Sequence, residues 1–293
     1  MAKPSVNRTA LGAAACRLME QYEPEETRLF TDPLIKSMFS KSYVFFFQFA
    51  SMRRATVKLM DNMAEGIYGS QVCRTVYIND VVQAALAQNI DQVVILGAGL
   101  DTRGFSLPGV TQARVFEVDL PAGQKVKKSR VQKHFGRLPE NVTFVPVDFD
   151  LQSLDKAFAG SGYDPARPTV FVWEAVTQYI TEDAVRNTLA FVGKSAPGSV
   201  LVFTYILLDI IEQRFPGSEK LMKMVAQDSP WIFGLDPAAV PDFLKPYNLT
   251  LIEDVGNAYY QEKYLKPRGR KLVVSEGERV ARAVVSSFPD PSR

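Results

Sequence analysis

The chain has 293 residues, of which 46% are hydrophobic and 23% are charged, a balance typical of a globular protein with a substantial core. Its net charge of +2 gives no electrostatic reason to bind nucleic acid. With two cysteines and one histidine, the composition excludes a disulfide framework and a multi-histidine metal centre. It shows neither a signal peptide nor an apolar run of about 18 residues, so we expect a cytoplasmic protein with no membrane partner.

The first ninety residues have the character of helices. Met60, Met63 and Ile67 recur at helical spacing, which predicts a helix through this stretch. Residues 43–49 contain four phenylalanines, and two interpretations are open. The run is either the buried face of a helix or an apolar lid or partner surface.

From residue 91 onward, short apolar runs rich in β-branched residues alternate with helical stretches. One predicted helix covers residues 121–134, and another begins after Thr181, a candidate N-cap. This alternation predicts an α/β fold with a mostly parallel sheet, an antiparallel edge and helices on both faces. The predicted strands are 92–96, 114–118, 142–145, 169–173, 199–205 and 249–255, with a last strand at either 272–274 or 278–285.

Ligand-binding features follow each of the first three predicted strands. Gly97-Ala98-Gly99 comes directly after the first strand, where glycines allow a sharp turn and close approach to a ligand. Asp119 closes the second strand, and its carboxylate can accept hydrogen bonds from both hydroxyls of a ribose. Asp148 and Phe149 follow the third strand and suit an adenine, although Asp148 could instead cap a turn. Together these features predict a site for an adenosine-containing ligand.

The residues after the glycine turn favour S-adenosylmethionine over a dinucleotide. A dinucleotide fingerprint has a third glycine where this chain has Thr102. The adjacent Asp101 would repel a pyrophosphate, whereas S-adenosylmethionine carries no phosphate. An NAD(P)-dependent oxidoreductase is the alternative from a different class, and a catalytically silent protein that binds the methyl donor is a third.

With these residues in place, the sequence resembles the leucine carboxyl methyltransferase-like family of S-adenosylmethionine-dependent methyltransferases. The Gly-Ala-Gly-Leu-Asp-Thr-Arg run is much more specific than a bare glycine turn. Two departures stand out: Asn79 replaces the family's usual Asp, and Thr177-Gln178 replaces apolar residues. The similarity is carried by residues 73–80, 93–103, 116–121 and 173–180.

The resemblance implies a Rossmann-like class I methyltransferase sheet with an N-terminal helical lid. We expect residues 1–90 to form this substrate-capping lid and residues 91–293 to form the cofactor-binding core as one compact unit. Glu174 and Tyr179 are the implied catalytic residues, near the methyl-transfer zone and facing the substrate. The implied cofactor-binding residues are Arg74, Gly97, Gly99, Asp101, Asp119, Asp148, Phe149 and Glu174.

The shortage of histidine favours a carboxylate as methyl acceptor. A carboxylate is already ionised at neutral pH, whereas an alcohol or phenol needs a general base, commonly histidine. The only histidine, His134, stands among basic residues that include Lys127, which predicts a solvent-exposed helix face. We therefore expect O-methylation of a small organic acid, with S-adenosylhomocysteine as the second product; a protein C-terminal carboxylate is the alternative acceptor.

The acceptor pocket is less well determined by the sequence. A cationic clamp and apolar walls are needed, and residues 45–49 and Trp173 are candidate walls. The oligomeric state is left open, with a homodimer as one possibility. Five arginines are candidates for the clamp: Arg17, Arg53, Arg54, Arg268 and Arg270.

Overall fold

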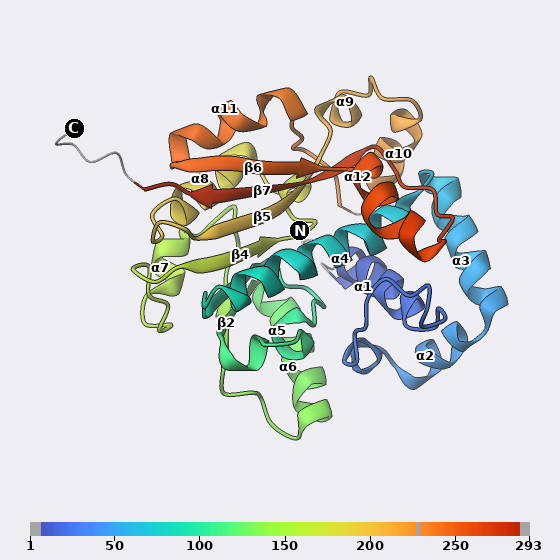
Figure 1. The fold of residues 1–293 in the computed structure, drawn as a ribbon, viewed down its shortest axis with the longest axis horizontal. Coiled ribbons are helices and arrows are strands. Elements are labelled where there is room, and N and C mark those ends of the chain that lie inside the picture. Colours follow the sequence, from blue (N-terminus) through green and yellow to red (C-terminus); the bar gives the residue numbers. More distant parts are fainter. Residues whose placement is uncertain (1–6, 227–228, 288–293) are drawn as a thin grey trace.

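The computed structural model describes residues 7–226 and 229–287, and a seven-stranded sheet lies at its centre (Figure 1). The strand order is β3-β2-β1-β4-β5-β7-β6, in which β1 to β5 pair in parallel and β7 runs antiparallel to both β5 and β6. The predicted α/β fold with a mostly parallel sheet and an antiparallel edge is therefore confirmed. The strands are β1 (Gln92–Leu96), β2 (Arg114–Asp119), β3 (Val142–Pro146), β4 (Thr169–Trp173), β5 (Val200–Ile206), β6 (Leu249–Val255) and β7 (Glu278–Val285).

The helices connect the strands and form the N-terminal part of the chain. Thr181 is the predicted N-cap of α8, since its side chain accepts a hydrogen bond from Ala184 N. Of the two candidate last strands, residues 278–285 form β7 and residues 272–274 lie outside the sheet. The helices are α1 (Asn7–Glu20), α2 (Lys41–Gln48), α3 (Ala50–Met63), α4 (Ile67–Ala87), α5 (Arg103–Ser106), α6 (Pro121–Phe135), α7 (Leu154–Phe158), α8 (Glu182–Val192), α9 (Leu208–Ile211), α10 (Ser218–Val225), α11 (Val240–Leu244) and α12 (Asn257–Tyr260).

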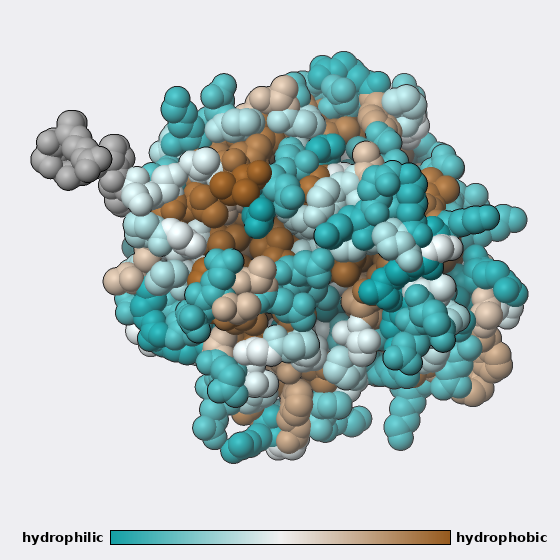
Figure 2. Space-filling model, viewed as in Figure 1, coloured by the Kyte–Doolittle hydropathy of each residue, from teal (hydrophilic) through white to brown (hydrophobic). Residues whose placement is uncertain are grey.

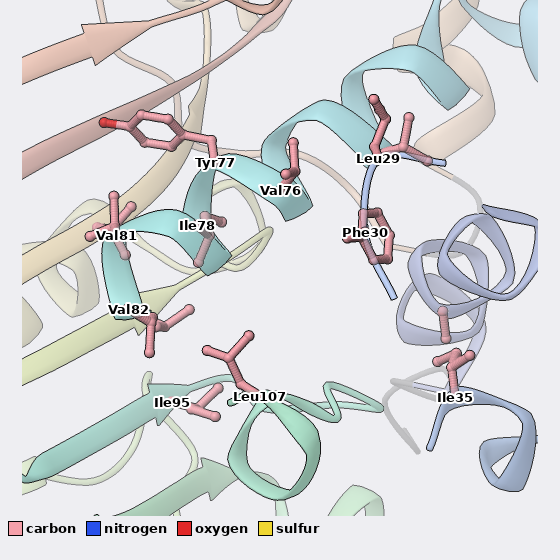
Figure 3. Packing of buried hydrophobic residues seen from close by; sticks show 14 of the residues in the cluster. Leu29, Phe30, Ile35, Val76, Tyr77, Ile78, Val81, Val82, Ile95 and Leu107 are labelled. Atoms are coloured by element: carbon pink, nitrogen blue, oxygen red, sulfur yellow. The ribbon is translucent and has the colours of Figure 1, made fainter. Parts of the chain in front are cut away.

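Helices cover both faces of the sheet, because successive residues of a strand point to opposite sides. Val93 and Ile95 of β1 pack into one hydrophobic cluster with residues of α1, α4, α5 and α6. Val94 and Leu96 pack into a second cluster with residues of α7, α8 and α11. Figure 3 shows part of the first cluster, in which Val82 of α4 lies close to Ile95. Burial on both faces explains why the strands are continuously apolar.

The N-terminal helices differ from expectation at one turn. The spacing of Met60, Met63 and Ile67 predicts a single helix, but α3 ends at Met63 and α4 begins at Ile67. Gly66 separates the two with a φ of +77°, and a Cβ there would lie 2.4 Å from Ser275 N. The prediction of one helix is wrong because a distant segment passes against this turn. The division of the chain at about residue 90 stays a prediction.

The aromatic run on α2 is mostly exposed. Phe47 is buried, but the exposed fractions are 59% for Phe45, 43% for Phe46 and 49% for Phe49. The interpretation of residues 43–49 as a buried helix face is therefore wrong for three of the four phenylalanines. An apolar partner surface stays a prediction.

The surface is polar over most of the face in Figure 2, with its largest apolar area over β5, β6 and β7. There Val200 and Val284, which are paired in register on β5 and β7, are only half-buried. Within the described ranges, we find no helix with the length and apolar character that a membrane crossing needs.

Two helical glycines provide a test of how tightly α4 is packed. A Cβ on Gly69 of α4 would lie 2.0 Å from Val273 O, whereas a Cβ on Gly12 of α1 would have no atom within 4 Å. We expect Gly69→Ala to lower the free energy of unfolding by about 1–3 kcal/mol or more through overpacking. Gly12→Ala should raise it by up to about 1 kcal/mol, since alanine loses less backbone entropy in a helix. Urea unfolding followed by circular dichroism measures both, and equal effects would contradict the close contact at Gly69.

Candidate functional site

A cavity of about 650 Å³ lies at the carboxyl ends of the parallel strands, where open α/β sheets bind their ligands. Its walls come from the loops after β1 to β4 and from α1, α3, α4 and α10. Figure 1 shows β4 and β5 ending toward α1 and α10, on the side of the sheet where the cavity lies. The predicted site residues all line it: Arg74, Gly97, Gly99, Asp101, Asp119, Asp148, Phe149, Glu174 and Tyr179.

Two glycines set the shape of the loop after β1. Gly97 and Gly99 have φ angles of +69° and +42°. A Cβ on Gly97 would lie 2.2 Å from Cγ2 of Val176, so a larger residue does not fit there. The backbone N–H groups of Gly99 and Leu120 each donate to the Asp119 carboxylate at 2.6 Å. These bonds hold the glycine loop against the end of β2.

The two acidic residues predicted to face an adenosine both reach the cavity. Burial raises the pKa of Asp119 above its ordinary value, and the two backbone N–H donors offset part of the shift. Asp148 also stabilises its own turn, because its Oδ1 accepts a hydrogen bond from Asp150 N at 3.2 Å. Asp148 therefore has both predicted features: it stabilises a turn and it lines the cavity. Phe149 packs half-buried beside it against the second hydrophobic cluster.

A buried chain of alternating charges runs along one side of the cavity. Arg17 of α1 begins it, with Nη2 3.0 Å from Asp32 Oδ2 and Nη1 3.0 Å from Asp101 Oδ1. Arg103 Nη1 continues it, at 2.6 Å from Asp101 Oδ2 and 2.5 Å from Glu174 Oε2. The chain therefore joins α1, the loop after β1 and the end of β4.

Arg74 extends this chain to the last strand. Its Nε donates to Glu174 Oε1 at 2.8 Å, and its Nη1 lies 2.5 Å from Glu278 Oε1. Burial raises the pKa of Glu174, but Arg103 and Arg74 outweigh it and bring that pKa below its ordinary value. Glu174 is therefore ionised at neutral pH, although its side chain is only 13% exposed.

Asn79 takes part in the same arrangement. Arg103 Nε donates to Asn79 Oδ1 at 2.6 Å, and Arg103 Nη2 donates to the carbonyl oxygen of Thr75 at 3.4 Å. The amide at position 79 thus still anchors α4 to the site, where a carboxylate is usual in the family that the sequence resembles. Arg103 therefore has a structural role at the site. The sequence motif alone did not predict this role.

Four of the five candidates for an arginine clamp do not line the cavity. Of the five candidates only Arg17 lines the cavity, and it is already paired with two carboxylates. Arg270, for example, pairs with Glu20 at 2.8 Å instead. Within the described part of the chain, the cations that line the cavity are Arg17 and Arg74.

The predicted aromatic walls are also wrong. Trp173 is completely buried in the sheet, and neither it nor residues 45–49 belong to the cavity lining. Met60 and Met63 of α3 and Trp231 after α10 form apolar walls instead. The periodicity of the two methionines was visible in the sequence, whereas Trp231 lies in a segment without a motif.

Lys127 corrects another expectation. The basic residues around His134 predict a solvent-exposed helix face, but Lys127 is 1% exposed and forms an ion pair with Glu117 on β2. Its ammonium also donates to the carbonyl oxygen of Ala98 at 3.2 Å, which supports the glycine loop from beneath. Burial raises the pKa of Glu117 to about 7, although Lys127 acts in the opposite direction.

Protonation of Glu117 should make stability depend on pH. Its pKa rises from 4.5 to about 7 on folding, so the folded state binds more protons between these values. The contribution to stability is complete below pH 4.5 and is lost as the pH rises through 7, which we expect to amount to about 3 kcal/mol. Urea unfolding of the wild type and Glu117→Gln across this range measures it. A wild-type slope that persists unchanged in Glu117→Gln would rule out this origin.

Known proteins match this chain in sequence. The family described as "Leucine carboxyl methyltransferase" matches residues 10–193. A Streptomyces coelicolor protein named "Putative S-adenosyl-L-methionine-dependent methyltransferase" is 32% identical over 217 residues, which cover 72% of this chain and 72% of that protein. A Frankia alni protein with the same description is 40% identical over 151 residues, covering 50% of this chain and 51% of that protein.

Solved structures agree with the fold. A methyltransferase-like structure from Thermobifida fusca has a TM-score of 0.57 at 18% identity, and the match covers 82% of this chain and 90% of that one. A DUF574 family protein from Streptomyces avermitilis has a TM-score of 0.57 at 16% identity, covering 92% and 96%. The family match extends over more than half of the chain and over every segment that forms the glycine loop and the charged chain up to Glu174. The protein therefore belongs to the leucine carboxyl methyltransferase family and is an S-adenosylmethionine-dependent methyltransferase.

Proposed function

We propose that the enzyme methylates a carboxylate oxygen of a small organic acid. The observation that carries this proposal is the position of the chain's only histidine. His134 lies on α6, with Nδ1 2.6 Å from Ser37 Oγ, and it does not line the cavity. Burial raises the pKa of Tyr179, so its hydroxyl stays protonated at neutral pH and is unsuited to act as a base. A carboxylate acceptor needs no base, unlike an alcohol or a phenol.

In this proposal the loops after β2 and β3 hold the adenosine part of the cofactor. Asp119 accepts hydrogen bonds from the ribose hydroxyls, a role for which its buried carboxylate is already oriented by two backbone N–H groups. Asp148 and Phe149 contact the adenine. The backbone at Gly97 and Gly99 passes beside the methionine part, where the absence of Cβ atoms leaves room.

The amino and carboxylate groups of the methionine part lie at the buried charged chain. Glu174 faces the ammonium, and Arg74 shares its guanidinium between the cofactor's carboxylate and its own two acidic partners. Asp101 keeps both neighbouring arginines in place. The part of the charged chain that lines the cavity has three carboxylates and two arginines, so it favours a cationic ligand. The carboxylates among the described lining residues are Asp101, Asp119, Asp148, Asp150, Glu174 and Glu278.

The protein contributes position and environment to the transfer. When bound, S-adenosylmethionine supplies the methyl group: the acceptor oxygen forms the new O–C bond, the S–C bond breaks with its electron pair on sulfur, and a methyl ester and S-adenosylhomocysteine result. The cavity walls hold the acceptor in line and exclude water. Such positioning supplies up to about 7–11 kcal/mol of the barrier in favourable models.

Asp119→Ala should weaken cofactor binding while leaving the protein folded. We expect S-adenosylhomocysteine affinity to fall at least tenfold, since the variant loses the ribose acceptor and the partner of Gly99 N–H. Asp119→Asn is the matched comparison, because it keeps one oxygen for the loop and should lose less. Isothermal titration calorimetry measures the affinity and circular dichroism the fold. Unchanged affinity in Asp119→Ala would remove this residue from the cofactor site.

Acceptors matched in carbon skeleton test the chemistry directly. We expect octanoic acid to be methylated and 1-octanol and octylamine to be left unchanged, as measured by mass spectrometry of the products. The kcat/KM of the acid should be flat between about pH 6 and 9, because no general base titrates. A peptide with a free C-terminal carboxylate tests the alternative acceptor. Preferential methylation of the alcohol or the amine would overturn the proposal.

A further inference from the structure

The cavity has a second part whose chemistry differs from that of the cofactor site. Met60 and Met63 at the end of α3 face residues of α10 and of the segment after it, including Leu221, Met224 and Trp231. These side chains are apolar and come from elements that the cofactor motifs do not cover. A wall of this kind buries an apolar ligand and offers no partner to a charged one.

Polar atoms without partners mark one end of this apolar wall. Gln178 Oε1 and Trp231 Nε1 are both buried and lack a hydrogen-bond partner, and both residues line the cavity. Gln178 is only 3% exposed. The backbone N–H of Ile232 donates to Gln178 O at 2.8 Å, so the two segments are held side by side. Buried polar groups are rarely left unsatisfied, because each costs about 1–3 kcal/mol.

Tyr179 follows Gln178 in the chain and lines the cavity together with it and with Trp231. The indole of Trp231 and the amide of Gln178 are close enough to its hydroxyl to lower its pKa slightly against the larger effect of burial. Among the described residues, neither the indole Nε1 nor the amide Oε1 has a hydrogen-bond partner within bonding distance and angle. Tyr179 and Trp231 thus offer two neutral hydrogen-bond donors among the residues that line the cavity.

From this arrangement we infer that Tyr179 and Trp231 donate to the acceptor's carboxylate and that the substrate is a monocarboxylic acid with a bulky apolar body. This inference rests on the proposed function and names its substrate class. Neutral donors replace an arginine clamp, since both lining arginines are already paired with carboxylates. A second charge on the acid would meet the apolar wall and is therefore disfavoured.

The counter-charge for such an acid comes from the cofactor. Among the described lining residues both arginines are already paired with carboxylates, so they leave no uncompensated positive charge for an acid. A positive charge at the sulfonium position supplies one. The acid should therefore bind well only when a positively charged cofactor is already in place, and poorly beside the neutral thioether of S-adenosylhomocysteine.

Binding of 4-phenylbutanoic acid tests the inference without turnover. The protein is saturated with sinefungin, which carries an amine in place of the sulfonium and has no methyl group to transfer. Calorimetry then measures the acid's affinity. We expect succinic acid and 4-phenylbutanamide to bind at least tenfold more weakly than 4-phenylbutanoic acid, and S-adenosylhomocysteine to support weaker acid binding than sinefungin.

Trp231→Phe and Tyr179→Phe test the named donors. Each should weaken the acid about five- to tenfold, the effect of one lost hydrogen bond, while sinefungin affinity stays unchanged and reports an intact fold. Trp173→Phe is the matched control, because its Nε1 is also buried without a partner but Trp173 does not line the cavity. We expect this control to bind the acid like the wild type.

The possible outcomes separate the inference from the function on which it rests. Wild-type acid affinity in both Trp231→Phe and Tyr179→Phe would overturn the inference, as would tighter binding of succinic acid or no binding of 4-phenylbutanoic acid. If the methyl ester forms but Trp231→Phe does not change the affinity for 4-phenylbutanoic acid, the proposed function is supported and the inference is refuted. Acid binding that depends on Trp231 without any ester formation would refute the proposed function alone.

Discussion

The buried chain of alternating charges is the constraint on which the site depends. It contains three arginines and four carboxylates and joins α1, the loop after β1, α4, the end of β4 and the start of β7. Removing one member of a buried ion pair typically costs about 3–5 kcal/mol, because the partner's charge is left uncompensated. Each element at the cavity is therefore held in place by the others. Glu174 owes its ionised state to Arg74 and Arg103 rather than to solvent.

Much of the fold could be predicted from local sequence, because its signals are local. The strands between residues 92 and 206 are apolar runs buried on both faces, and their limits matched to within one residue. The glycine loop, Asp119 and Asp148 were found because they stand at strand ends, which parallel strands bring to one edge. The break at Gly66 and the burial of Lys127 were missed, since each is decided by a contact with a residue distant in sequence.

The two halves of the cavity also differ in how well the sequence predicts them. The cofactor half is built from segments with recognisable motifs, and all of its predicted residues line the cavity. The acceptor half is assembled from α3, α10 and the segment at Trp231, which share no motif and meet only in three dimensions. Four of the five arginines predicted as candidates for the acceptor clamp lie outside this lining, because residue type alone does not show which arginines reach the cavity.

The position of β7 has a consequence for how the molecule is made. This strand follows β6 in the chain but lies between β5 and β6, and it begins with Glu278, the partner of Arg74. During synthesis β6 is made before β7, the strand with which it pairs. Arg74 likewise lacks the carboxylate of Glu278 until about two hundred further residues have been added. The β5 edge of the sheet therefore stays unpaired until β7 has been synthesised, at a stage when the residues of the cofactor loop are already present.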